Sequence, residues 1–384
     1  MPIYHSLGTF PHKRHTQFKK KDGSLHHEHL MGTYGFSGPA SLLYHLRMPT
    51  RILSEELLEV QKWEVEPDQH ARMRHFRLFE LPEGGSPVLG RIPVAFNGDV
   101  AISYVQPDET DGFHFRNSSG DELIYIIEGE GTLESLYGEF PYRAGDHVMV
   151  PRGILYRMVL GKGPHRYVVL ESEDYIRFPE RYRTHFGQLQ EHSPVCERDI
   201  RRPSTLTTHD EEGEFPVVIK RAKTLTRVMM DHHPLDVVGW DGYYYPWAIN
   251  IEDFEPITGS LHQPPPVHQL FETNGFVFCN FVPRMFDYHP EAIPAPYNHS
   301  NVMSDEVLVY ANDEFMSRKG IEKGSLTLHP TGLTHGPQPG KYEGSVGKKE
   351  TKELAIMLDT FRPLNVAKAV LSAEDPSYAR SWVV

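Results

Sequence analysis

The chain contains an internal repeat of two matched elements. Residues 121–129 (DELIYIIEG) are echoed by 305–313 (DEVLVYAND), and residues 144–156 (AGDHVMVPRGILY) by 323–335 (KGSLTLHPTGLTH). In both copies the glutamate follows an asparagine by five residues, and a Pro-x-Gly-x-x turn ends the second element. Matched elements in the same order indicate a duplicated structural unit. Because short β-rich runs bounded by Gly, Asp and Pro are typical of sandwiches and barrels, the repeat predicts two β-barrels in tandem.

The second copy carries three potential metal ligands, His299, Glu306 and His335. Two imidazoles and one carboxylate, without cysteine, are typical of a non-haem Fe(II) centre, in which open positions remain for a substrate and dioxygen. The residues at the same places in the first copy are Phe115, Glu122 and Tyr156. Since phenylalanine cannot coordinate a metal, we expect chemistry only in the second copy.

These elements resemble the two motifs of the cupin family. The first motif reads His299-Ser-Asn301-x4-Glu306-x6-Asp313, and the second reads Gly324-x5-Pro330-x-Gly332-x-x-His335. Asn301 stands where the cupin motif has a second histidine, which leaves a site of two histidines and one carboxylate. The resemblance implies an all-β-dominated fold of two tandem cupin (jelly-roll) β-barrels, with short helices and an N-terminal arm.

Three longer stretches are similar to the homogentisate 1,2-dioxygenase family: YNHSNVMSDE (297–306), GSLTLHPTGLTHGP (324–337) and DVVGWDGYYYPW (236–247). The resemblance is clear from about residue 236 to 340 and weaker through the first barrel. It implies that His299, Glu306 and His335 bind Fe(2+), with Asn301 and Ser304 as candidates to support these ligands by hydrogen bonds. It further implies that His329 binds substrate and that His262 acts as an acid or base, with His268 as the competing residue.

Two departures from the family pattern affect these assignments. One extra residue precedes the glutamate, so strict family spacing would place Asp305 at the ligand position, whereas the cupin spacing and the repeat with Glu122 favour Glu306. Phe315 stands where the family has a substrate-binding tyrosine. The lost hydroxyl indicates a relaxed or altered substrate.

The function implied by the resemblance is Fe(2+)-dependent, extradiol-type ring cleavage of a dihydroxylated aromatic acid, foremost homogentisate to maleylacetoacetate, in tyrosine and phenylalanine degradation. His262 or His329 would take the phenolic proton, because the pKa of an imidazole suits that task near neutrality. The alternatives are a related substrate such as gentisate, or a bicupin that binds a metal or small ligand without turnover. The expected partners are the aromatic substrate, dioxygen and further copies of the chain, as a trimer or hexamer.

The strand-rich runs and the stretches between them predict five segments. Residues 1–90 would form an N-terminal arm with strands that pack on the barrels, and residues 91–175 a first barrel without metal ligands. A connecting segment would span 176–235, the catalytic second barrel 236–365, and a C-terminal tail 366–384.

Composition excludes some functions. The formal net charge of −13 argues against a nucleic-acid-binding surface. The two cysteines, Cys196 and Cys279, are too few for a disulfide framework. No apolar run is long enough to span a bilayer, and the first residues lack the apolar core of a signal peptide. We therefore expect a cytoplasmic protein that binds neither nucleic acid nor membrane.

Overall fold

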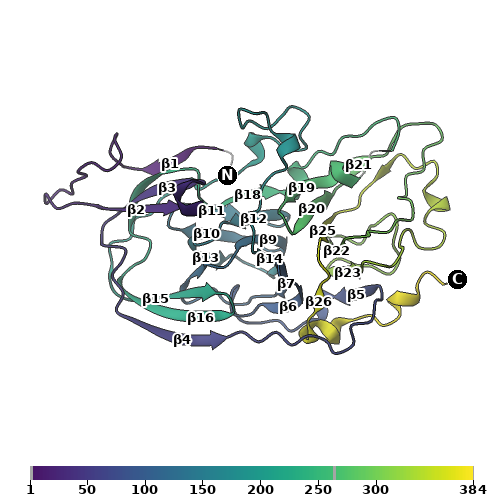
Figure 1. Ribbon diagram of the computed structural model, residues 1–384, viewed down its shortest axis with the longest axis horizontal. Coiled ribbons are helices and arrows are strands. Elements are labelled where there is room, and N and C mark those ends of the chain that lie inside the picture. Colours follow the sequence, from purple (N-terminus) through teal and green to yellow (C-terminus); the bar gives the residue numbers. More distant parts are fainter. Residues whose placement is uncertain (1–2, 263–264, 384) are drawn as a thin grey trace.

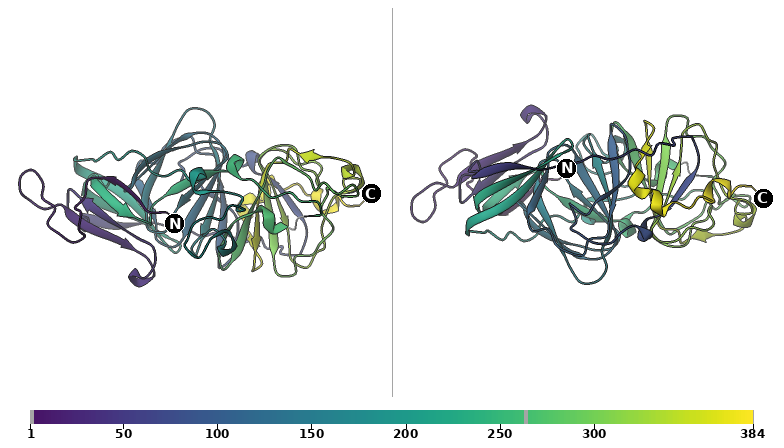
Figure 2. Two further views of the ribbon diagram at one scale, coloured as in Figure 1. Left: turned by 90° about the horizontal axis from the view of Figure 1, so that it is seen from above. Right: turned by 90° about the horizontal axis from the view of Figure 1, so that it is seen from below.

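The computed structural model describes residues 3–262 and 265–383, and its regular structure is almost entirely β-strand (Figure 1). The expected all-β fold with two tandem cupin barrels, short helices and an N-terminal arm is confirmed. The molecule is elongated, with the N-terminal sheet at one end and the second barrel at the other (Figure 2). None of the helices in the described ranges has the length and apolarity needed to cross a membrane.

The helices are all short 3-10 segments. They are η1 (Tyr34–Phe36), η2 (Leu78–Glu80), η3 (Glu180–Tyr182), η4 (Glu197–Asp199), η5 (Ile251–Asp253), η6 (Pro265–His268), η7 (Glu343–Ser345), η8 (Lys368–Ala373) and η9 (Tyr378–Arg380). The N-terminal sheet has the order β1-β17-β3-β2. Its strands are β1 (His5–Gly8), β17 (Val237–Gly242), β3 (Ala40–His45) and β2 (His27–Gly32).

The first barrel is built from two seven-stranded sheets. One has the order β11 (Gly138–Tyr142), β10 (Gly131–Ser135), β13 (Leu155–Leu160), β8 (His114–Asn117), β15 (Glu212–Arg221), β16 (Thr224–His232) and β4 (Ser54–Val60). The other has the order β18 (Trp247–Asn250), β12 (Asp146–Val150), β9 (Asp121–Glu128), β14 (Arg166–Ser172), β7 (Val100–Val105), β6 (Ile92–Phe96) and β26 (Asn365–Val366).

The second barrel is organised on a six-stranded sheet. Its order is β19 (Gln269–Glu272), β20 (Phe276–Phe281), β25 (Ala355–Thr360), β22 (Asp305–Tyr310), β23 (Ser325–His329) and β5 (Arg74–Arg77). A two-stranded sheet, β21 (Arg284–Met285) with β24 (Glu350–Thr351), and long loops complete this barrel.

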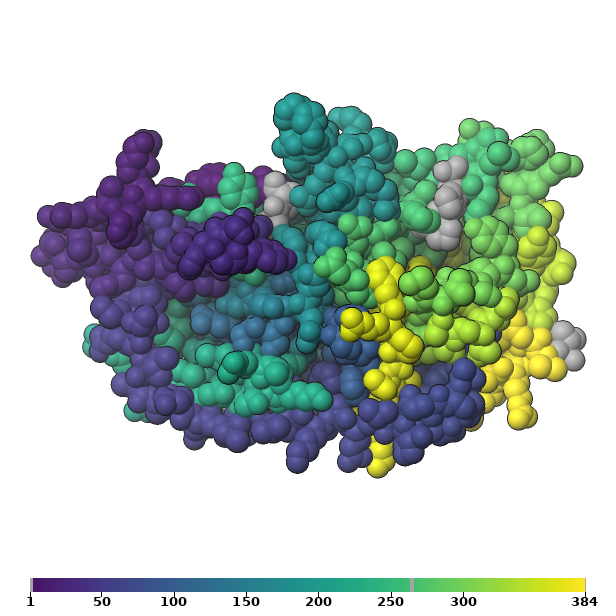
Figure 3. Space-filling model, viewed as in Figure 1, coloured from purple at the N-terminus to yellow at the C-terminus, as the bar shows by residue number. Residues whose placement is uncertain are grey.

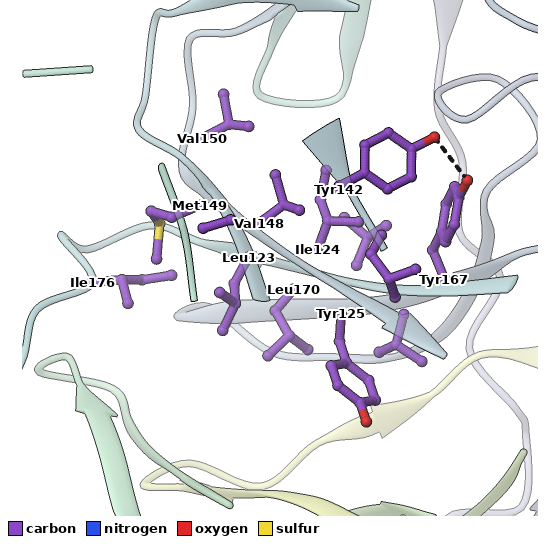
Figure 4. Close-up of a cluster of buried hydrophobic side chains, with 14 of the residues drawn as sticks. Leu123, Ile124, Tyr125, Tyr142, Val148, Met149, Val150, Tyr167, Leu170 and Ile176 are labelled. Carbon is purple, nitrogen blue, oxygen red and sulfur yellow. Dashed lines mark hydrogen bonds between the residues drawn. The ribbon is translucent and has the colours of Figure 1, made fainter. Parts of the chain in front are cut away.

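Strand β9 shows how the two barrels share a core. Seven of its eight residues are buried, because one face lines the first barrel and the other faces the second barrel. In the interior, Tyr142 and Tyr167 join their hydroxyls at 3.1 Å (Figure 4). On the opposite face, Tyr125 stacks on His147, and the His147 ring meets the edge of Phe278 in the second barrel. Most buried apolar residues of both barrels belong to one continuous cluster, and a smaller, separate cluster in the second barrel includes Leu308, Tyr310 and Met357.

Several strands pair across the boundaries of the segments expected from the sequence. β5, from the expected N-terminal arm, pairs with β23 of the second barrel. β18, expected in the second barrel, pairs with β12 of the first, and β15, from the expected connecting segment, pairs with β8. Unpaired backbone groups at a sheet edge are satisfied by the nearest available strand, whatever its place in the sequence.

The C-terminal tail is bound to both barrels. β26 pairs with β6 of the first barrel. The residues that follow it lie against the segment that contains β5, as the yellow and blue residues show in Figure 3. Through these contacts the tail lies against the six-stranded sheet of the second barrel, which carries the predicted ligand Glu306.

Candidate metal centre

The first two residues of strand β22, Asp305 and Glu306, have different roles. Both oxygens of Asp305 accept backbone hydrogen bonds, from Thr331 at 2.7 Å and from Leu364 at 2.7 Å. Its counterpart in the first barrel, Asp121, accepts the same kind of pair, from Arg152 and Ile176 at 2.9 Å each. The aspartate is therefore a structural anchor for the turn after the second motif strand. The carboxylate that remains for a metal is that of Glu306.

Glu306 lies beside His299 and His335, and the ligand atoms of these three residues lie within 4.8 Å of one another. Their separations are 3.6 Å from His299 Nε2 to Glu306 Oε2 and 3.5 Å from His335 Nε2 to the same oxygen. The two histidines come from loops that a backbone bridge joins, with N–H···O bonds of 2.8 and 2.9 Å between them. Residues from three places in the sequence thus converge on one point.

The tautomers of the two histidines suit metal binding. His299 Nδ1 lies 3.1 Å from the carbonyl of Tyr297, and His335 Nδ1 lies 3.2 Å from the carbonyl of Leu333. Because a carbonyl only accepts, each Nδ1 carries the proton, and each Nε2 keeps its lone pair. The Nε2 atom of His335 is buried without a hydrogen-bond partner. A metal ion would provide the missing partner for this nitrogen.

The charge of Glu306 also favours a bound cation. Burial opposes its ionisation, but its contacts with His299, His329 and His335 hold its pKa well below the ordinary range. In the described part of the chain, no lysine or arginine forms an ion pair with this carboxylate. A buried carboxylate of this kind requires a compensating positive charge.

The first barrel shows what replaces a metal at the equivalent place. Tyr156 faces Phe115 across β13 and β8, just as His335 faces His299. Arg91 donates to Glu122 and, at 3.0 Å, to the hydroxyl of Tyr156, and its guanidinium lies over the ring of Phe115. Tyr156 in turn donates to Glu122 at 2.5 Å. A guanidinium therefore neutralises the glutamate that a divalent cation would neutralise in the second barrel, and the triad fits a metal such as Fe(2+).

A cavity of about 320 Å³ opens onto Glu306 and His299. Its aromatic wall includes Phe281 and Phe315, whose rings meet edge to face at 5.9 Å. Phe315 also meets Tyr310 edge to face at 4.9 Å. The structure thus places Phe315 in the wall of the cavity, where it presents an apolar edge.

Both competing histidines line this cavity, but in different environments. The side chain of His262 is 44% exposed, and its Nδ1 lies 3.5 Å from Asp287 Oδ2. His268 is buried, its Nδ1 has no partner, and burial lowers its pKa to about 3. A buried imidazole with so low a pKa accepts a proton poorly, so His262 is the better placed acid or base.

The substrate-binding and catalytic roles of His329 remain predictions, and in this structure its ring contacts Glu306 and Tyr378. His329 pairs directly with Glu306 across β23 and β22 and is fully buried outside the cavity lining. Its Nδ1 lies 2.7 Å from Glu306 Oε1, and its Nε2 lies 3.1 Å from the hydroxyl of Tyr378. Burial lowers its pKa to about 4. The neutral ring therefore donates to the glutamate and accepts from the tyrosine, which makes it a positioning residue.

The two residues expected to support the ligands differ in role. Asn301 lines the cavity and donates to Asp359 at 3.2 Å rather than to a ligand. Burial, together with the charge of Glu306, raises the pKa of Asp359 to about 7. Ser304 makes a long backbone contact of 3.5 Å to the Asn301 carbonyl, so its assignment as a supporting residue is not upheld.

Sequence reasoning missed Tyr378 and Trp382 of the C-terminal tail. The ring of Tyr378 stacks on His329, and that of Trp382 meets His329 edge to face. The indole of Trp382 donates to the carbonyl of Gly336, next to the ligand His335, at 3.0 Å. No motif marks these two residues, because their contacts with the site depend on the path of the tail.

The comparisons with known proteins agree with this architecture. Residues 88–251 match the family model described as "Homogentisate 1,2-dioxygenase N-terminal". The chain is 41% identical over 387 residues to a Saccharolobus solfataricus protein named "Putative dioxygenase", in an alignment that covers 100% of this chain and 99% of that protein. It is 27% identical over 286 residues to a homogentisate 1,2-dioxygenase of Bradyrhizobium diazoefficiens, covering 70% of this chain and 62% of that enzyme.

Among solved structures, a cupin 2 conserved barrel domain protein from Leptotrichia buccalis matches 79% of this chain at 8% identity and a TM-score of 0.35. The fold is that of a bicupin, and within residues 3–262 and 265–383 one group of two histidines and a carboxylate could hold a metal. The chain belongs to the homogentisate 1,2-dioxygenase family.

Proposed function

We propose that this protein is an Fe(2+)-dependent dioxygenase that cleaves the ring of a dihydroxylated aromatic acid, foremost homogentisate to maleylacetoacetate. The observation that carries the proposal is the convergence of His299, Glu306 and His335 at a cavity with an aromatic wall. An orphaned imidazole nitrogen and an uncompensated carboxylate in this triad favour a divalent cation. The named relatives support oxygenase chemistry.

The chain would hold the metal on one face through its three ligands. Fe(2+), when bound, would supply Lewis acidity toward the substrate oxygens and the electron transfer that dioxygen activation requires. The carbonyls of Tyr297 and Leu333 would keep Nε2 of the two histidines free of protons, and His329 would fix the orientation of Glu306. This arrangement would prepare the ligand set before the substrate enters.

The cavity wall would position the aromatic ring. Phe281 and Phe315 offer edges and faces that favour offset or edge-to-face contact with another ring. Because Phe315 has no hydroxyl, this side of the ring would be held by packing rather than by a hydrogen bond. We propose that the protein therefore tolerates variation in the ring substituent on that side.

His262 would move the phenolic proton. Its half-exposed ring lies at the cavity and beside Asp287, which would hold the ring and stabilise its protonated form. The reaction balances without an external reductant, since both atoms of dioxygen enter the product and the ring supplies the electrons.

The test is anaerobic reconstitution with Fe(2+) followed by oxygen uptake with homogentisate, gentisate and hydroquinone. We expect uptake of about one dioxygen per homogentisate, with an ultraviolet band of the ring-opened product. His335→Ala should lose both iron and activity, while the exposed His12→Ala should retain both. Full iron loading with no uptake on any of the three compounds would refute the proposed function.

A further inference from the structure

Two arginines line the metal cavity, and their charges differ in availability. Arg284 forms an ion pair of 2.8 Å with Glu353, whose side chain is 1% exposed. It also donates to the carbonyl of Val282 at 3.1 Å. The charge of Arg284 is therefore cancelled inside the protein, and this residue has little to offer an anionic ligand.

Arg318 is buried without such cancellation. It is 5% exposed, and no carboxylate in the described ranges forms an ion pair with it. Its Nη1 donates to the carbonyl of Ser317 at 3.3 Å, to the hydroxyl of the same residue at 3.1 Å and to the carbonyl of Gly336 at 2.9 Å. Its Nε is buried and has no partner. A buried guanidinium in this state is costly unless an anion joins it.

The geometry around Arg318 leaves one donor nitrogen for a ligand. The ring of Trp382 lies 5.6 Å from its guanidinium carbon, and the Nη1 bonds fix the plane of the group. The side chain also forms a hydrogen bond with Tyr378, and its unpartnered Nε remains as a charged donor for a carboxylate.

We propose that Arg318 is the receptor for the carboxylate of the substrate. The inference rests on the proposed function and adds the residue that selects an acid over a neutral hydroquinone. The charges agree with this role. A divalent metal, ionised Glu306 and Arg318 sum to two positive charges, and a hydroquinone acid bound through one phenolate and one carboxylate carries two negative charges.

If Arg318 had only a structural role, its hydrogen bonds would matter and its charge would not. The Nη1 bond to Gly336 braces the residue next to His335, and that brace needs a donor but no charge. Arg318→Gln keeps an amide donor and removes the charge, whereas Arg318→Lys keeps the charge. The exposed Arg362→Gln, at an arginine outside the cavity lining, provides the matched control.

The experiment measures anaerobic equilibrium binding of 2,5-dihydroxyphenylacetate and of its neutral amide to the iron-loaded proteins, with iron content determined in parallel. The wild type should prefer the acid, and Arg318→Gln should reduce that preference by about 10- to 100-fold. Arg318→Lys should retain more of the preference than Arg318→Gln, and Arg362→Gln should retain the wild-type ratio.

Equal weakening of acid and amide by Arg318→Gln would overturn the proposal. So would a wild type that binds the amide as tightly as the acid, an outcome that requires no variant to fold or load iron. An Arg318-dependent preference for the acid without oxygen uptake would support the binding role and refute the dioxygenase function alone. Oxygen uptake with an unchanged preference in Arg318→Gln would refute the binding role alone.

Discussion

His329 and Glu306 face each other across the β22–β23 ladder, and a hydrogen bond of 2.7 Å joins Nδ1 of the histidine to Oε1 of the glutamate. The other oxygen of Glu306 is the one that points toward His299 and His335. His329 thus fixes one oxygen of the carboxylate, and the other oxygen is directed toward the two candidate ligand histidines. This division explains why His329 is buried while its partner borders the cavity.

His329→Ala should weaken metal binding by about 10- to 100-fold, because loss of a residue that orients a ligand typically has this effect. Competition with a metal-binding dye would measure the dissociation constant. The exposed His12→Ala is the control for removal of a histidine. Unchanged affinity in His329→Ala would show that Glu306 is oriented without it.

Tyr378→Phe should have a smaller effect of the same sign. It removes the hydroxyl 3.1 Å from His329 Nε2 while keeping the stacked ring. The loss of one hydrogen bond, about 1 kcal/mol, corresponds to roughly a five-fold weaker metal affinity. The same dye competition tests it, with the exposed Tyr243→Phe as control. If Tyr378→Phe weakened metal binding more than His329→Ala does, the tyrosine could not act on the site through His329 alone.

Asp305 and Glu306 should respond in opposite ways to loss of charge. Glu306→Gln should abolish metal binding and leave the metal-free fold intact. Asp305→Asn should destabilise the fold by about 1–3 kcal/mol, since one oxygen that accepts a backbone N–H becomes a donor. Metal content and urea denaturation of the metal-free proteins distinguish the two. Metal loss in Asp305→Asn at wild-type stability would make Asp305 the ligand.

Arg91→Met should destabilise the first barrel, because it leaves Glu122 buried and without its cation. Removal of one partner from a buried ion pair costs about 3–5 kcal/mol. Arg91→Met/Glu122→Gln should recover part of this loss, since no uncompensated charge remains. Urea denaturation would measure both variants. Equal destabilisation by the single and double variants would argue against charge compensation as the reason for Arg91.

His147 should make stability depend on pH. Burial between the barrels lowers its pKa from 6.5 to about 3. In that window the unfolded chain binds a proton that the folded chain does not, so the free energy of unfolding falls as the pH falls. This one group contributes a slope of up to about 1.4 kcal/mol per pH unit. His147→Phe should reduce the measured slope between pH 6.5 and the acid transition by that amount, whereas His12→Phe should leave it unchanged.

The sequence by itself determined the repeated barrel unit and the three candidate metal ligands that the fold brings together. Ligand spacing within a motif depends on strand alternation and turn length, which are local properties, and the copy in residues 121–156 served as an internal reference. That reference favoured Glu306 over the neighbouring Asp305. It also showed that the first barrel carries Phe115 and Tyr156 in place of histidines.

The tertiary structure alone decided which distant residues complete the site. Sequence spacing placed His329 near the ligands, but only strand pairing set it opposite Glu306, and only the path of the tail brought Tyr378 to its other nitrogen. The pairing of β5 with the second barrel and of β18 with the first has the same origin. Such contacts join residues that are well separated in the sequence, and the packing of whole sheets selects them, so no local pattern in the chain records them.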